Sequence, residues 1–439
     1  MKKTLLSLLI SVGMTTSAYA DSLFEVYQQA LQNDPTTLQS KAIKEAAFVN
    51  IDRSRASLLP QISASLSAGR SYSDVRASSS STTDSTGASI NLNQSIYDRS
   101  NWIALDRAEL EASRADTIYA QAMQNLIVRT VTSYFNTLQA KDDLEFAKAE
   151  KRAIERQLEQ TKQRFNVGLT AVTDVHEAQA QYDTSVASEI SAENAVETNL
   201  EALREITGRY YSALNVLNTE TFSAAMPAPA NINDWLKLAD ELNLQLIAAN
   251  TSVDISKFDI KSARSGHLPT VSLSASAGSG DSSKDQNHVT TDSHSNSYSV
   301  GLGVSIPIYS GGRVSADVDA AKFSFIADSE ERERIHRQVI RSVRSNYNDV
   351  KAAIARIKAF EQAVISAESA LNATNAGFEV GTRTIVDVLN STRNLFDARR
   401  NLSRVRYGYV TSVMQLKLAA GKLSEQDVKD IDAALVAQN

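Results

Sequence analysis

Two long stretches without glycine or proline constrain this chain most. Eighty residues separate Gly87 from Gly168, and another 64 separate Gly312 from Gly377. Both stretches are rich in Ala, Glu, Gln, Lys, Arg and Leu, which are the strongest helix formers. We therefore predict two very long helices, over about 99–165 and 312–377. Each would be about 100 Å long at a rise of ~1.5 Å per residue.

The chain also contains an internal duplication. Leu59 to Gly69 aligns with Leu268 to Gly278 at an offset of 209, and Phe165 to Val175 aligns with Phe378 to Val388 at an offset of 213. A nearly constant offset indicates two copies of one structural plan. Thr173 or Asp174 is expected to cap the first return helix. The predicted parts are repeat 1 over 21–208 with a return helix at about 172–207, a linker over 209–232, repeat 2 over 233–421 with a return helix at about 385–420, and a tail over 422–439.

Four short segments alternate apolar with small polar residues, and we predict strands at about 61–72, 89–97, 270–278 and 298–308. In each, one face carries side chains such as Ile62 or Val300, and the other carries mostly serine and glycine. This pattern is typical of a membrane barrel strand with lipid on one side and water on the other. A half-buried strand of a soluble sheet also alternates, but the small polar residues favour the barrel. The segments at 73–88 and 279–296 are predicted to be solvated loops.

The N-terminal 20 residues have the pattern of an export signal. Lys2 and Lys3 precede an apolar run, and Ala18-Tyr19-Ala20 forms a small-x-small cleavage site. Loss of these two lysines changes the formal charge from −6 to −8, which argues against a nucleic-acid partner. No later stretch reaches the ~18–20 apolar residues of a transmembrane helix. A membrane crossing would therefore use strands, and four strands are too few to close a barrel, so several chains must share one.

No motif for catalysis, cofactor binding or metal binding stands out. The chain has no cysteine, which excludes disulfides, thiolate catalysis and cysteine metal sites. The two glycines at Gly278 and Gly280 lack the third glycine of a dinucleotide loop. His288 and His294 could bind a metal together with Asp285 and Asp292, but a solvated loop is the favoured interpretation. We predict no enzyme, no cofactor and no metal, so any transport energy comes from a partner; a trimeric surface adhesin and a periplasmic enzyme with helical arms stay open as alternatives.

The chain resembles the outer membrane efflux protein family, the trimeric channel-tunnel proteins of bacterial drug efflux and type I secretion. The most specific similarities lie at 266–269, 307–309, 167–175 and 380–388. The resemblance implies a mainly α fold with membrane β-structure: a homotrimer with a long-helix α-barrel in the periplasm and a shared 12-stranded β-barrel in the outer membrane. It implies a passive, gated exit duct. Its implied partners are outer-membrane lipid, a periplasmic adaptor, and an inner-membrane transporter of the RND, ABC or MFS type.

The same resemblance assigns roles at the helix tips. Thr173 and Asp174 would bond Arg383 of a neighbouring protomer to hold the periplasmic gate shut, and Phe378 stands where the family has a gate tyrosine. Asp387 and Asn390 stand where the family has two aspartate rings at the entrance. We therefore expect a gate that opens more easily and weaker block by multivalent cations. The expected tip turns, where the adaptor would dock, are formed by Val167, Gly168, Leu169, Val380, Gly381 and Thr382.

Overall fold

The computed structural model describes residues 21–437 except 75–79, 220 and 287–288. The predicted export signal and His288 lie outside the described residues. The helices are α1 (Leu23–Asn33), α2 (Pro35–Ala56), α3 (Arg99–Asn166), α4 (Val172–Thr207), α5 (Ile232–Leu242), α6 (Leu244–Ser265), α7 (Arg313–Glu379), α8 (Ile385–Ala419) and α9 (Glu425–Asp432). The strands are β1 (Gln61–Ser73), β2 (Ser81–Tyr97), β3 (Val216–Leu217), β4 (Thr270–Gln286), β5 (Val289–Ser305) and β6 (Leu435–Val436).

The elements occur in two sets of nearly equal length. Helices α1 and α5 have 11 residues each, and α2 and α6 have 22 each. The long helices α3 and α7 have 68 and 67 residues, and the return helices α4 and α8 have 36 and 35. Two duplicated segments therefore fold by the same plan.

The chain divides into two compact units. The first contains Met1–Leu38, Gln121–Asn243 and Gln338–Asn439, and the second contains Gln39–Ala120 and Leu244–Arg337. Helices α2, α3 and α7 have residues in both. Among the described residues, the helices lack the combination of length and apolarity that a membrane-crossing helix requires.

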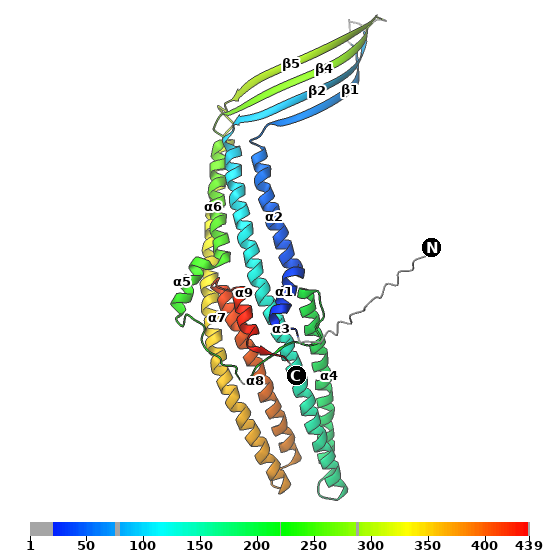
Figure 1. Ribbon diagram of the computed structural model, residues 1–439, viewed down its shortest axis with the longest axis vertical. Helices are drawn as coiled ribbons and strands as arrows, with labels where there is room; N and C mark the ends of the chain where they lie inside the picture. The colour runs from blue at the N-terminus through cyan, green and yellow to red at the C-terminus, as the bar shows by residue number, and fades with distance from the viewer. Residues whose placement is uncertain (1–20, 75–79, 220, 287–288, 438–439) are drawn as a thin grey trace, which may run out of the picture. The chain divides into compact units, whose positions relative to one another are not determined.

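The second unit contains one antiparallel sheet with strand order β1-β2-β4-β5 (Figure 1). Its register places like residues together: Ile62 pairs with Leu92, and Ser65 pairs with Ser89. The Ser65 and Ser89 hydroxyl oxygens lie 2.7 Å apart, so both side chains project from the same face. The predicted alternation of an apolar and a small polar face is therefore present across the sheet.

The strands extend further than the sequence indicates, and the two predicted loops are largely wrong. β2 begins at Ser81 and β4 runs to Gln286. These segments contain Asp and Gly, which are depleted in strands, and they show no apolar alternation. They form strands nevertheless, because each continues the hydrogen-bonded ladder of its neighbour. The fourth strand ends at Ser305 rather than near 308, where Pro307 can donate no ladder hydrogen bond.

The first unit has a large apolar core between its helices. Tyr134, Phe135 and Leu138 of α3 pack there with Tyr407 and Met414 of α8. The core also holds α1, α4, α9 and the short strand pair β3–β6, which joins the linker after α4 to the C-terminal tail. A second, smaller cluster lies farther along the long helices, with Ile154 and Leu158 on α3 and Ile385 on α8. The helical hairpins α3/α4 and α7/α8 are thus joined by apolar contacts at two levels.

Candidate functional site

The two helical hairpins of the first unit end in turns of the same geometry. In the α3–α4 turn, Gly168 has a φ of 77°, and the Leu169 N–H donates to the Arg164 carbonyl at 2.8 Å. In the α7–α8 turn, Gly381 has a φ of 78°, and the Thr382 N–H donates to the Gly377 carbonyl at 2.8 Å. Residues with a Cβ rarely adopt this left-handed conformation, which is why glycine ends both helices.

Apolar side chains project into solvent from both turns. Val167 is 69% exposed, Leu169 is 68% exposed and Val380 is 75% exposed. Apolar residues at such exposure in equivalent turns of two repeats form a surface suited to contact with another protein.

The structure places the predicted gate residues at these tips without joining them inside one protomer. Asp174 lies in the first turn of α4 and accepts a hydrogen bond from the Thr170 hydroxyl. Thr173 is exposed beside it. Arg383 is exposed and lies against Gly377, where an added Cβ would come within 2.7 Å of its Cγ. Among the ion pairs between described residues, none includes Arg383 or Asp174.

The helix caps of the two tips differ, which corrects the expected cap of α4. The N-cap of α4 is Ala171, whose side chain makes no capping hydrogen bond, so neither Thr173 nor Asp174 has that role. The equivalent residue of the second repeat is Thr384. It forms a capping box with Asp387: the Thr384 N–H donates to the Asp387 carboxylate at 2.9 Å, and the Asp387 N–H donates to the Thr384 hydroxyl at 3.2 Å.

The two predicted entrance residues both have local partners. The backbone N–H of Thr384, followed by its hydroxyl, holds the pKa of Asp387 below its usual value. Asn390 is exposed, and its side-chain oxygen accepts a hydrogen bond from Arg393. Asp387 therefore carries its charge while it also anchors the start of α8.

Phe378 is a packing residue in this structure. Its side chain is 8% exposed and belongs to the small apolar cluster near the tips. The Arg164 guanidinium lies over its ring, 4.6 Å from the centroid. This cation–π contact links α3 of the first repeat to α7 of the second, in the same protomer.

A polar seam between α3 and α8 was missed by the sequence reasoning. The Tyr407 hydroxyl donates to Asp142 at 2.8 Å, and Arg400 donates to Glu150 at 2.8 Å. Burial raises the pKa of Asp142. The sequence signal for this seam is the spacing of Arg400, Ser403, Arg404 and Tyr407, which places four polar side chains on one face of α8.

Comparison with known proteins decides the family. The family model for outer membrane efflux proteins matches residues 26–209 and 235–422, one match for each repeat. The chain belongs to the outer membrane efflux protein family. It is 45% identical over 436 residues to the outer membrane protein TolC of Vibrio cholerae, with 99% of each chain covered. It is 28% identical to the alkaline protease secretion protein AprF of Pseudomonas aeruginosa, covering 96% of this chain and 88% of that protein.

The fold agrees with this assignment. The CmeC outer membrane channel of Campylobacter jejuni superimposes with a TM-score of 0.79 at 17% identity, covering 99% of this chain and 98% of that one. The family and the fold are those of outer-membrane channels. The chain is therefore an outer-membrane protein with a helical periplasmic part, and it serves as an exit duct for efflux and type I secretion.

Proposed function

We propose that this chain acts as a homotrimeric, passive duct with a gate at its periplasmic tips. The sheet supports the trimer, because β1 and β5 are its edge strands and, among the described residues of one chain, each has a partner strand on one side only. Unpaired strand edges are intolerable in lipid. β1 and β5 run in opposite directions, so β5 of one chain can pair with β1 of the next in the antiparallel pattern. Three chains then close an even-numbered barrel of twelve strands.

The proposed gate depends mainly on Arg383. It lies exposed beside the α7–α8 turn, and among the described residues of one chain it has no ion-pair partner. Thr173 and Asp174 lie just after the equivalent turn of the other repeat. A bond from Arg383 to these residues in the neighbouring chain would tie the three pairs of hairpins together. An arginine–carboxylate hydrogen bond is charge-assisted and directional, and although one exposed pair contributes only ~0–1 kcal/mol, three act together.

The proposed partners follow from two features of the chain, which are the absence of a nucleotide-binding motif from its sequence and the exposed apolar side chains at its tips. With no motif for nucleotide binding, energy comes from an inner-membrane transporter of the RND, ABC or MFS class. A periplasmic adaptor would dock on the apolar tips that include Val167, Leu169 and Val380. AprF, by its name, serves protease secretion; protein cargo is therefore proposed for this duct beside small molecules.

Single-channel conductance in a planar bilayer tests the gate. Arg383→Ala and Asp174→Ala should each raise conductance, because each removes the same bond. The double variant should match the larger single effect rather than the sum of both. Arg156→Ala is the matched control, since Arg156 is also an exposed arginine on a tip-forming hairpin. Wild-type conductance in both single variants would show that packing alone holds the tips shut.

A further inference from the structure

The polar face of the four-stranded sheet carries almost no charge. The register aligns its residues in rows across the sheet, such as Ser65, Ser89, Gly278 and Ser297. Within the described strands, every position of this face is Ser, Thr, Gly, Asn or Gln, apart from Val289 and a single lysine, Lys284. A face of this composition, opposite an apolar one, is the water-facing side of a barrel strand.

Lys284 lies near the C-terminal end of β4, which is the end remote from α6 in the same unit. Its direct cross-strand neighbours are Thr83 on β2 and Thr291 on β5. The next residues of β4 on the same face are Ser282 and Gln286. The Lys284 side chain is exposed. Among the described strand residues of this face, therefore, no carboxylate neutralises its ammonium group.

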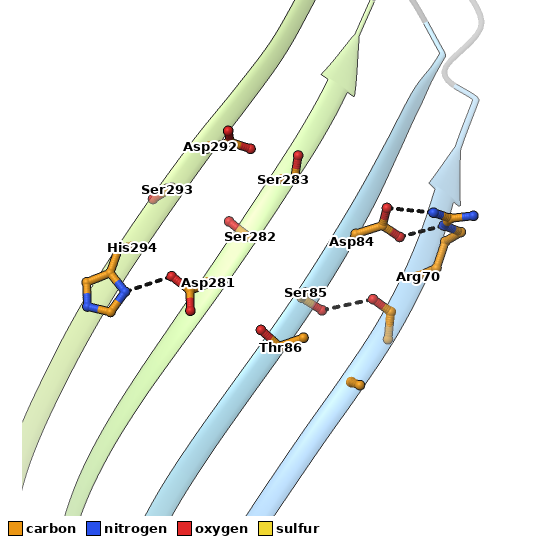
Figure 2. A pocket seen from close by; sticks show the side chains of 12 residues that line it. Arg70, Asp84, Ser85, Thr86, Asp281, Ser282, Ser283, Asp292, Ser293 and His294 are labelled. Atoms are coloured by element: carbon orange, nitrogen blue, oxygen red, sulfur yellow. Dashed lines mark hydrogen bonds and ion pairs between the residues drawn. The ribbon is translucent and has the colours of Figure 1, made fainter.

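The other charges at this level of the sheet project from the opposite face. Arg70 donates to Asp84 at 2.7 Å, and the His294 ring lies 2.7 Å from Asp281 (Figure 2). These pairs share a face with Ile62 and Leu92, because they lie an even number of positions from the apolar residues along each strand. They form a charged collar directly beyond the apolar band. The two faces of the sheet thus differ in charge at the same level.

We infer that Lys284 determines ion preference at the outer mouth of the duct, as the one cationic group among the described strand residues on the pore-facing side of each chain. This inference rests on the proposed trimer, which brings three Lys284 side chains to one level. Twelve strands about 4.8 Å apart and tilted about 40° close on a backbone radius of about 12 Å. The long lysine side chains point inward, so the axis lies within about one Debye length, ~8 Å, of all three ammonium groups.

Three positive charges at the mouth would favour anions and oppose cations that enter from outside. Screened Coulomb attraction from three charges at this distance changes the local ion concentration by about threefold. Cationic compounds outside the cell would meet a barrier at the mouth, whereas anionic cargo would leave readily.

Reversal potentials in a salt gradient test this inference on the full-length protein. Lys284→Glu should shift the cation-to-anion permeability ratio about threefold or more toward cations, and Lys284→Arg should keep the wild-type ratio. Ser283→Glu is the matched control, because it adds a carboxylate to the adjacent residue on the opposite face and should leave the ratio unchanged. An unchanged ratio in Lys284→Glu, or equal shifts in both glutamate variants, would overturn the inference.

A thiol test separates this inference from the proposed trimer. The chain has no cysteine, so Lys284→Cys introduces a single thiol per protomer. A negatively charged thiol reagent added on the outer side should change the current in up to three discrete steps, and Ser283→Cys should give none. Channels that form but do not respond at position 284 would refute the pore-facing lysine alone. Failure of the wild-type protein to form trimers or channels would refute the proposed function instead.

Discussion

Phe378 and Phe165 occupy equivalent positions in the two repeats but have different surroundings. Phe378 is 8% exposed, whereas Phe165 is 42% exposed. The Arg164 guanidinium covers the ring of Phe378. The residue equivalent to Arg164 in the second repeat is Gly377, so Phe165 has no corresponding arginine. The two copies have therefore diverged at the tips, and the buried ring belongs to the hairpin that carries Arg383.

This difference predicts unequal effects of one substitution. Phe378→Ala should destabilise the tip cluster by about 3–5 kcal/mol, as expected for truncation of a buried phenylalanine. Looser tips should also raise single-channel conductance. Phe165→Ala is the matched control and should cost less than about 1 kcal/mol. Thermal unfolding in detergent and bilayer conductance measure the two effects, and equal effects of both substitutions would contradict the packing role of Phe378.

Asp387 and Asn390 should determine how strongly multivalent cations block the channel. If Asp387 alone provides the carboxylate ring at the entrance, Asp387→Asn should remove most of the block by multivalent cations, and Asn390→Asp should strengthen it. Because hydrogen bonds from Thr384 hold the pKa of Asp387 below its usual value of 3.8, the block should persist in mild acid near pH 5. Conductance titrations with a trivalent cation measure the block. If neither substitution alters it, the cation site lies elsewhere.

At the scale of elements, the break between α1 and α2 depends on one buried carboxylate. The Asp34 side chain accepts hydrogen bonds from the Thr37 N–H at 2.8 Å and from Arg129 of α3 at 2.6 Å. Although burial raises the pKa of Asp34, these hydrogen bonds outweigh it and leave the pKa below 3.8. The equivalent residue between α5 and α6 is Asn243, whose amide donates to the Ala419 carbonyl at 2.9 Å. An amide side chain is therefore compatible with the break between the two helices, as Asn243 shows in the second repeat.

Asp34→Asn should keep the helix cap but lose the charged bond to Arg129. We expect a cost of about 1–2 kcal/mol near neutral pH, because Arg129 is partly exposed. A lowered pKa in the folded state contributes stability above the unfolded pKa and loses it as pH falls through the folded value. The difference between wild type and variant should thus be constant from pH 5 to 8 and shrink below about pH 4. Asp52→Asn, at an exposed site on α2, is the control; a difference that persists in strong acid would contradict this assignment.

The limits of the helices and strands show which parts of the fold can be predicted from the sequence. The long helices end within two residues of their predicted limits, because glycines at 168 and 381 mark the turns. Strands β2, β4 and β5 extend beyond their predicted limits at the ends remote from α6, since Asp and Gly there are depleted in strands and apolar alternation is absent. The contacts of Phe378 with Arg164 and of Asp142 with Tyr407 join residues more than 200 positions apart. Local pattern cannot specify such pairs, which depend on how the two repeats pack.

For the whole molecule, the two faces of the sheet impose different requirements on assembly. Val300 projects from the apolar face of β5 and is 80% exposed in the single chain. Its neighbour Ser299 projects from the polar face, where its hydroxyl lies 2.8 Å from that of Ser276. In the proposed trimer, Val300 faces lipid and Ser299 faces water. The same new side chain at these adjacent positions therefore tests the assembly directly.

Val300→Lys should impair insertion and trimer formation, because a lysine facing the membrane interior costs about 2–4 kcal/mol per chain. Because three chains share one barrel, this free-energy cost applies three times in each trimer. Ser299→Lys should insert and assemble normally, since its ammonium group stays in water, and should alter only the ion preference of the channel. The measurements are the yield of detergent-resistant trimer in outer-membrane fractions and its mass by light scattering. Equal trimer yields from the two variants would show that these faces do not separate lipid from water, and a folded wild-type monomer would exclude the shared barrel itself.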